Sequence, residues 1–195
     1  QEDALYRTSI AVGAYPVDHH HARSTGAEEL PRLYFHPVPS FGLPLGTLIP
    51  TDVDNMIVAE KSISVSNIVN GTTRLQPVVL QIRTAAGTVA ALASKGSISP
   101  SQVSVREIQK AILDAGGYLL PYLDVAKDDN RFKAYQRIGA TGILKGEGRN
   151  VGWANQTWLR ADTLLLSTEL DGLKENYPKM TYQLPNDTIA LTVND

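Results

Sequence analysis

Short apolar runs interrupted by prolines characterise the first fifty residues. β-prone runs occupy residues 9–17 and 32–38, and a charged, glycine-containing stretch at 22–30 separates them. This pattern favours antiparallel strands joined by a loop. Residues 41–50 include two prolines, each of which fixes φ and lacks an N–H donor, so we expect a strand or an extended connection there and no helix.

The middle of the chain changes to helical patterns. A nearly continuous apolar run at 55–59 first predicts a buried parallel strand, covered on both faces. Turn and N-cap residues then stand together as Asn-Gly-Thr-Thr at 70–73, which predicts that a helix starts near there, with Pro77 in its first turn. From Val78 to Leu92, apolar and mostly small residues fall on almost every helical face, so we expect this helix to be closely packed all round and to end at Gly96.

A second, amphipathic helix is predicted to begin after Ser104 and to stop at the glycine pair 116–117. The character of the chain changes again at Pro121. The pattern then predicts a loop at 122–130, a helix at 132–140, a glycine-rich connection at 142–152, an amphipathic helix at 159–170 and a short strand at 188–193. Trp153 and Trp158 precede the amphipathic helix, and we expect them to cover the core of this unit.

These elements predict a mixed α/β fold of the α+β kind. We divide it into an antiparallel segment at 1–50, a strand, loop and helix region at 51–120 of the kind that closes a Rossmann-like domain, a helical unit at 121–175, and a tail with a short strand at 176–195. The chain starts with Gln-Glu-Asp, which is neither an initiator methionine nor a signal peptide. We therefore expect a fragment of a longer protein.

Composition narrows the function classes. The chain has 195 residues, with 18 basic and 20 acidic residues spread along it, so no basic face for nucleic acid is expected. It has no cysteine, which excludes disulfides, iron–sulfur clusters, thiolate zinc sites and cysteine nucleophiles. Polar residues at positions 81, 83 and 84 interrupt the longest apolar stretch, so no membrane span is expected.

Two groups of residues suggest chemistry. Backbone amides at 71–75 would lie at the predicted helix start, where the helix dipole favours an anion or an electron-rich carbonyl. Asp18, the histidines at 19–21 and His36 could form a metal site, but adjacent strand residues point to opposite faces and a histidine run in a loop is usually solvated. We therefore predict no metal site.

Several motifs together resemble a known family. They are Val-Asp-Asn-Met-Ile-Val-Ala-Glu-Lys-Ser-Ile-Ser at 53–64, Gly-Thr-Thr-Arg at 71–74 and Ala-Ala-Gly-Thr at 85–88, with Tyr-Pro-Val-Asp-His-His at 15–20 and Leu-Ile-Pro at 48–50. This set resembles the carboxyl-terminal part of bacterial FAD-dependent oxidoreductases, in the branch often labelled xanthan lyase, over residues 5–120. The resemblance implies that 51–120 is the closing part of an FAD-binding domain and that 1–50 lines the substrate side.

The resemblance also implies site residues. Weak catalytic candidates are Tyr15, Asp18 and His20, on the substrate side. The cofactor FAD would have as neighbours Glu60, Lys61, Asn70, Gly71, Thr72, Thr73, Arg74 and Leu75.

Three departures from the family pattern are visible. The family's Gly-Arg is here Glu60-Lys61, and the side chain of Glu60 is expected to crowd the ribityl chain of FAD. The family's Gly-Gln is here Arg83-Thr84. The Gly-x-Gly-x-x-Gly phosphate turn is absent, since the glycines at 146–152 have the wrong spacing and follow a helix. We expect an amino-terminal FAD-binding segment as the missing partner, and FAD held weakly by this fragment alone.

Residues 121–175 have a resemblance of their own. Tyr-Leu-Asp-Val at 122–125, the stretch 132–138, Gly-Ile-Leu-Lys-Gly at 142–146 and Leu-Arg-Ala-Asp at 159–162 resemble one S-layer homology module, a helical binder of wall polymers. The resemblance implies contact of Arg160 with an anionic saccharide. A single copy is expected to serve as a packing appendage.

The function predicted from these observations is the carboxyl-terminal portion of a flavin-dependent oxidoreductase, incomplete for catalysis on its own and acting on a small or carbohydrate-derived substrate. One alternative is a non-catalytic binding or assembly domain of a bacterial cell-surface protein. Another is a polysaccharide lyase acting on xanthan, with Tyr15 and a nearby histidine as its acid and base. A bacterial, extracytoplasmic setting is favoured.

Overall fold

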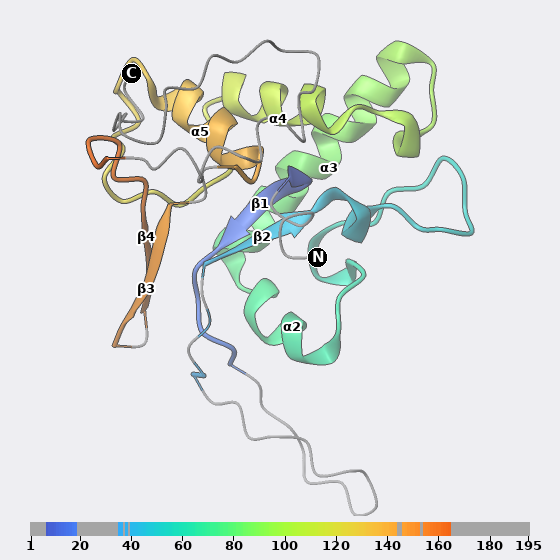
Figure 1. Ribbon diagram of the computed structural model, residues 1–195. Coiled ribbons are helices and arrows are strands. Elements are labelled where there is room, and N and C mark those ends of the chain that lie inside the picture. The colour runs from blue at the N-terminus through green and yellow to red at the C-terminus, as the bar shows by residue number, and fades with distance from the viewer. Residues whose placement is uncertain are drawn as a thin grey trace, which may run out of the picture.

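Two paired strands and a long helix form the centre of the fold (Figure 1). The structure is a computed structural model that describes residues 7–18, 35–36, 38, 40–143, 146–152 and 154–164. Strand β1 (Ser9–Gly13) pairs antiparallel with β2 (Phe41–Pro44), with a register shift between Ser9 and Ala11. Helix α3 (Gln76–Gly96) packs against β1. The strand expected from residue 9 is confirmed at 9–13, but its partner lies at 41–44, where a strand or extended connection was expected. The described part of the run at 32–38 contributes an isolated antiparallel bridge of His36 with Val17.

All five residues of β1 are buried, and glutamine side chains occupy the edge that β2 leaves open. Gln81 of α3 accepts from the amide of Val12 (3.1 Å) and donates to its carbonyl (2.9 Å). Gln109 donates to the carbonyl of Ser9 (2.8 Å). These bonds satisfy buried backbone groups and leave no open edge along β1 for a further strand.

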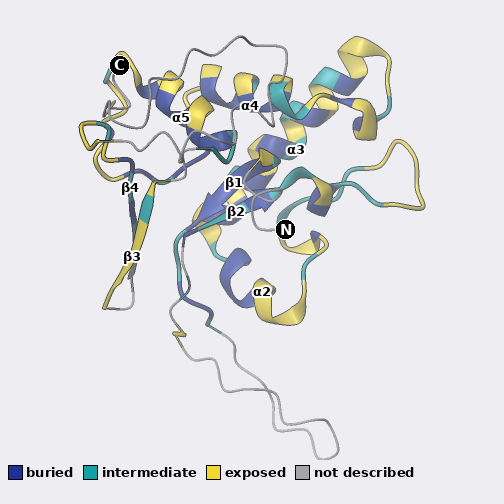
Figure 2. Ribbon diagram, in the orientation of Figure 1, coloured by how far each residue is buried: buried dark blue, intermediate teal, exposed yellow. Residues whose placement is uncertain are grey.

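Helix α3 has one buried face and one exposed face (Figure 2). Its buried residues are Val78, Val79, Ile82, Ala85, Val89 and Ala93. On the other face Gly87, Ala90 and Ala91 are exposed, and Leu80 is 57% exposed. The expected end at Gly96 is confirmed, whereas the expected close packing all round is wrong within the described residues.

The helix start predicted near 70–73, with Pro77 in the first turn, is confirmed by α3, but a short helix, α2 (Asn67–Thr73), precedes it, so the N-cap role predicted for 70–73 is wrong. The hydroxyl of Ser66 caps α2 by accepting from the amide of Val69 (3.3 Å), and residues 70–73 form its end. Pro77 lies in the first turn of α3, where its missing N–H is tolerated, but it could not continue α2. Turn chemistry at 70–73 therefore marks the junction of two helices.

The parallel strand predicted at 55–59 is also absent from the structure. These residues form a turn and an extended segment, and the amide of Val58 bonds to the carbonyl of Leu48 (2.9 Å). A 3-10 turn, η2 (Glu60–Ser62), follows. We predicted no helix at 41–50, but a 3-10 turn, η1 (Leu45–Leu48), occurs there. Pro44 is its N-cap residue, a position where the missing N–H of proline costs no helical hydrogen bond.

The second half of the chain packs on the same core. After the 3-10 turn η3 (Pro100–Gln102), helices α4 (Val105–Asp114) and α5 (Phe132–Ala140) agree with the predicted positions, and Ser104 is the N-cap residue of α4. The core runs without a break from β1 through α3 and α4 to α5 and Leu159. The predicted α+β fold class is confirmed.

Two expectations fail beyond α5. The glycine-rich connection contains a hairpin of β3 (Glu147–Val151) and β4 (Ala154–Trp158), joined antiparallel. Residues 159–164 are irregular, so the helix predicted from 159 is wrong over that range. The carboxylate of Asp124 instead accepts hydrogen bonds from the amides of Leu159 and Arg160. Trp153, residues 165–170 and the predicted strand at 188–193 lie outside the described residues.

Candidate functional site

Hydrogen bonds join the end of α2 to the segment 15–18, two regions that were predicted separately as cofactor and substrate sides. The hydroxyl of Thr72 donates to the carbonyl of Tyr15 (2.6 Å). The amide of Asp18 donates to the carbonyl of Gly71 (3.3 Å), and Nη2 of Arg74 donates to the carbonyl of Asp18 (2.8 Å). The structure thus brings the predicted residues Tyr15 and Asp18 together with the stretch 71–74.

Aromatic and ladder contacts extend this junction. The ring of Phe35 meets that of Tyr15 edge to face, with centroids 6.3 Å apart. Val17 and His36 exchange backbone hydrogen bonds of 2.9 and 3.1 Å. Phe35 is therefore a neighbour of the junction that sequence patterns did not assign to it, and His36 had been grouped with Asp18 only as a candidate metal ligand. His20 lies outside the described residues.

The backbone amides at 71–74 do not form the predicted anion site. Gly71, Thr72 and Thr73 are buried in the last turn of α2, and the amide of Arg74 donates to the carbonyl of Asn70 (3.1 Å). The N-terminus of α3, where the helix dipole is positive, begins after Leu75, its N-cap residue. The end of α3 that favours an anion or an electron-rich carbonyl therefore lies at Gln76, just after the stretch 71–75 that was predicted from the sequence.

Glu60 and Lys61 lie in η2, which packs against α3. Glu60 has φ of 60°, in the left-handed region, and its carboxylate Oε1 accepts from Nε of Arg83 (2.6 Å). Nη2 of Arg83 also contacts Oε1. Two departures from the family pattern are therefore partners in one ion pair.

The ion pair between Glu60 and Arg83 does not offset the free-energy cost of the backbone conformation at Glu60. A non-glycine residue with positive φ costs about 1–2 kcal/mol. The side chains of Arg83 and Glu60 are 58% and 45% exposed, and exposed ion pairs contribute about 0–1 kcal/mol. The pairing spans 23 residues of sequence, so helical or strand periodicity could not reveal it. The opposite charges of residues 60 and 83 were the available signal.

The residues present fit the flavin end of FAD better than its pyrophosphate. Arg74, Leu75 and the exposed Gln76 surround the start of α3, where donors and a positive dipole suit an electron-rich carbonyl. The only bond of the Arg74 guanidinium within the described residues is the one to Asp18. The described ranges contain no glycine-rich turn that joins a strand to a helix, the usual pyrophosphate cradle.

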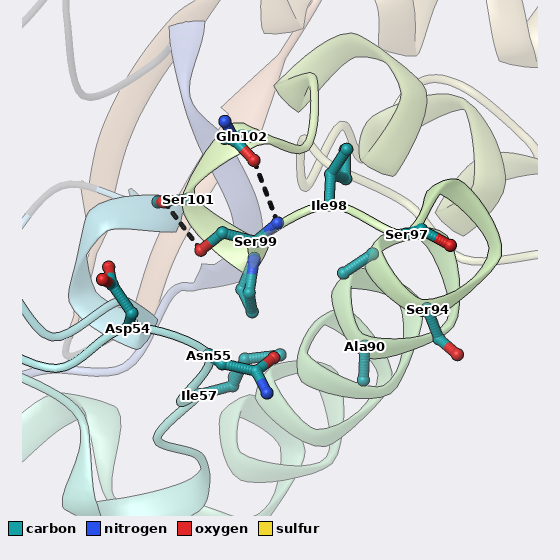
Figure 3. A pocket seen from close by; sticks show the side chains of 12 residues that line it. Asp54, Asn55, Ile57, Ala90, Ser94, Ser97, Ile98, Ser99, Ser101 and Gln102 are labelled. Atoms are coloured by element: carbon teal, nitrogen blue, oxygen red, sulfur yellow. Dashed lines mark hydrogen bonds between the residues drawn. The ribbon is translucent and has the colours of Figure 1, made fainter.

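A large cleft lies elsewhere in the described part of the chain (Figure 3). Its volume is about 790 Å³, and Asp54, Asn55 and several serines line it near the C-terminal end of α3. The hydroxyls of Ser99 and Ser101 bond to each other there (3.1 Å). Since twenty residues of helix rise roughly 30 Å, this cleft is remote from the start of α3. None of the predicted site residues lines it.

A second cleft, of about 440 Å³, lies between the start of α5 and the end of β4. Tyr135, Trp158, Arg131 and Arg160 contribute to its lining. Arg160 has φ of 54° and its Nε lies 2.8 Å from Oε2 of Glu147. Burial raises the pKa of the Tyr135 hydroxyl. The cleft thus combines aromatic rings and guanidinium groups with the carboxylates of Asp124, Asp129 and Asp162, and Arg131 is paired with Asp129 (3.1 Å).

Metal and membrane sites were also sought in the described ranges. No cluster of three His, Cys, Asp or Glu side chains suited to a metal ion occurs among these residues. No helix in the same ranges has the length and apolar character that a membrane crossing needs.

Comparison with known proteins gives one match. The family model described as FAD dependent oxidoreductase matches residues 1–112. A search of curated proteins and a search of solved structures found no match.

Proposed function

Because the chain belongs to the FAD dependent oxidoreductase family, we propose that it supplies the closing part of a flavin domain, with the flavin ring beside the end of α2 and the start of α3. The observation that carries this proposal is the junction of Thr72, Arg74 and Gly71 with Tyr15 and Asp18. It places predicted cofactor and substrate residues at one location. Bound FAD would supply the electron-accepting group, which no side chain can replace.

Arg74 is the residue we assign to the flavin itself. Its side chain is half-buried and held by one bond to the carbonyl of Asp18. The remaining guanidinium donors suit the electron-rich carbonyl edge of the flavin, where negative charge develops on reduction. Tyr15, Asp18 and His20 are proposed to face the substrate, which we take to be small or carbohydrate-derived.

The exposed face of α3 is proposed to contact an amino-terminal FAD-binding segment as its partner. Leu80 is 57% exposed there, and a Cβ added to Gly87 would meet nothing within 4 Å. Gly87, Ala90 and Ala91 would allow another backbone to approach closely. That segment would also hold the pyrophosphate and adenosine.

Titration of the chain with FAD, FMN, riboflavin and ADP tests this proposal. We expect FAD and FMN to bind with similar affinity, because the chain contacts mainly the flavin half, and ADP not to bind. Arg74→Gln should weaken FMN binding about tenfold, equivalent to ~1.4 kcal/mol. Arg137→Gln, at an exposed position on α5, is the matched control and should change nothing. Binding of ADP without binding of FMN would overturn the proposal.

A second candidate function follows from the cleft at Tyr135 and Trp158. We propose that this cleft binds a saccharide, because its aromatic rings suit sugar faces and its guanidinium and carboxylate groups suit sugar hydroxyls. The test is retention of the chain on bacterial cell-wall glycan. Arg160→Ala should abolish retention and Arg137→Ala should not, and a wild-type chain that is not retained removes this candidate.

A further inference from the structure

Glu60 has a backbone conformation that glycine adopts readily and glutamate does not. Its φ is 60°, after Ala59 in an extended conformation. Asn55, with φ of 57°, is a residue type that tolerates this region better. Its partner Arg83 stands seven residues after Gln76 on α3, roughly 10 Å along the helix from the proposed flavin position, and a strained glutamate at that distance points to a role other than stability.

The ion pair connects two elements, the η2 turn and helix α3. Glu60 belongs to η2, and Arg83 projects from the exposed face of α3. Both contacting nitrogens of Arg83 meet the same carboxylate oxygen, Oε1. Within the described residues Oε2 of Glu60 has no bonded partner. The paired side chains therefore occupy space beside the turn that a glycine at position 60 would leave open.

We propose that Glu60 and Arg83 form a paired barrier that limits how closely the ribityl chain of a flavin approaches the η2 turn, and thereby lowers flavin affinity. This inference rests on the proposed function. Arg83 holds the carboxylate in place and neutralises its charge. The paired side chains therefore exclude a neutral ligand by their volume alone. When Arg83 is removed, the unpaired carboxylate of Glu60 also repels a phosphate group.

Opposite effects of the two single substitutions follow from this arrangement. Glu60→Gly removes the barrier and releases the Arg83 guanidinium, so affinity should rise for riboflavin and rise further for FMN, whose phosphate Arg83 can bind. Arg83→Ala leaves an uncompensated carboxylate, so FMN should bind more weakly while neutral riboflavin is little affected. The difference between the two ligands separates the steric part from the electrostatic part.

The experiment is a fluorescence titration of the 195-residue chain with riboflavin and with FMN, for the wild type, Glu60→Gly, Arg83→Ala and the double variant. Circular dichroism confirms that each variant is folded. Glu60→Asn serves as a second variant at position 60, since asparagine also tolerates positive φ. Asn55→Gly is the matched control, because it changes another residue with positive φ at the remote cleft.

We expect Glu60→Gly to bind riboflavin about tenfold more tightly than the wild type, Glu60→Asn to bind it more tightly as well, and Asn55→Gly to bind it equally. If the wild type binds flavin and Glu60→Gly binds it no better or more weakly, the barrier is refuted and the proposed function stands. If no folded variant binds either flavin, the proposed function fails and the barrier with it.

Discussion

The hydroxyl of Thr72 lies 2.6 Å from the carbonyl oxygen of Tyr15 and donates a hydrogen bond to it across 57 residues of sequence. This bond fastens the last turn of α2 to the segment that leads out of β1. The amide of Asp18, bonded to the carbonyl of Gly71, extends the same contact. The candidate site therefore depends on a long-range junction whose strength can be measured.

Thr72→Val should weaken this junction. Valine keeps the shape of threonine but leaves the Tyr15 carbonyl without its donor, so we expect a loss of about 1 kcal/mol in the free energy of unfolding. The amide of Asp18 should exchange hydrogen faster. Thr88→Val is the control, because its hydroxyl bonds only to the carbonyl of Thr84 in its own helix (2.8 Å). Equal behaviour of the two variants in urea unfolding and hydrogen exchange would contradict the junction's importance.

Substitutions at Glu60 should separate strain from ion pairing. Glu60→Gly loses an exposed ion pair but relieves the positive φ, so its stability should stay within about 1 kcal/mol of the wild type. Glu60→Ala loses the pair and keeps the strain, and it should be less stable than the glycine variant by about 1 kcal/mol. Chemical denaturation measures both. An alanine variant as stable as the glycine variant would show that the backbone is unstrained.

Gln136→Leu should be among the more damaging single changes. Its buried side chain accepts from the amides of Leu119 (2.6 Å) and Leu120 (2.7 Å) and donates to the carbonyl of Leu120 (2.9 Å). Leucine would leave these buried backbone groups unsatisfied, at a cost of about 3 kcal/mol in unfolding free energy. Gln76→Leu, on the exposed start of α3, is the control. A small loss at position 136, equal to the control, would mean that this network does not anchor α5.

Asp114 gives a prediction for the pH dependence of stability. Hydrogen bonds from Lys110 and Lys133 lower the pKa of this carboxyl from 3.8 to about 2, and the second one joins α4 to α5. A depressed folded-state pKa stabilises the protein above pH 4, and this contribution is lost as the pH falls toward 2.

The melting temperature of Asp114→Asn, compared with that of the wild type, tests this. The variant should melt lower at pH 6, and the two should converge as the pH approaches 2. The difference should also shrink in high salt, because the carboxylate is exposed to solvent. A difference between the two proteins that does not change with pH would contradict the assignment.

Local patterns predicted the helices with clear periodicity and clear ends. The spacing of Ile108 and Ile112 and the stop at Gly96 are local properties, and α3, α4 and α5 agree with them. The start of α3 near Pro77 was predicted, but the N-cap role given to 70–73 was wrong because turn residues fit a helix end as well as a helix start. The strand predicted at 55–59 was wrong because an apolar run does not reveal whether a neighbouring strand exists to pair with it.

The candidate site was predictable only in part, and for a related reason. The resemblance to a known family implied that Arg74 and Glu60 belong to the site, and the structure shows which residues they contact. Which residues they contact depends on chain segments that are distant in sequence, such as Asp18 and Arg83. Pairing of that kind has no period, so only the folded arrangement reveals it.

An NMR titration of the chain with FMN would detect a flavin that lies beside the end of α2 and the start of α3. Chemical shifts should change at the amides of Gly71–Gln76 and Glu60, and those of Ser97–Gln102 at the cleft near the end of α3 should stay unchanged. Shift changes confined to Ser97–Gln102, or none at a concentration of FMN that saturates Glu60→Gly, would contradict this position of the flavin.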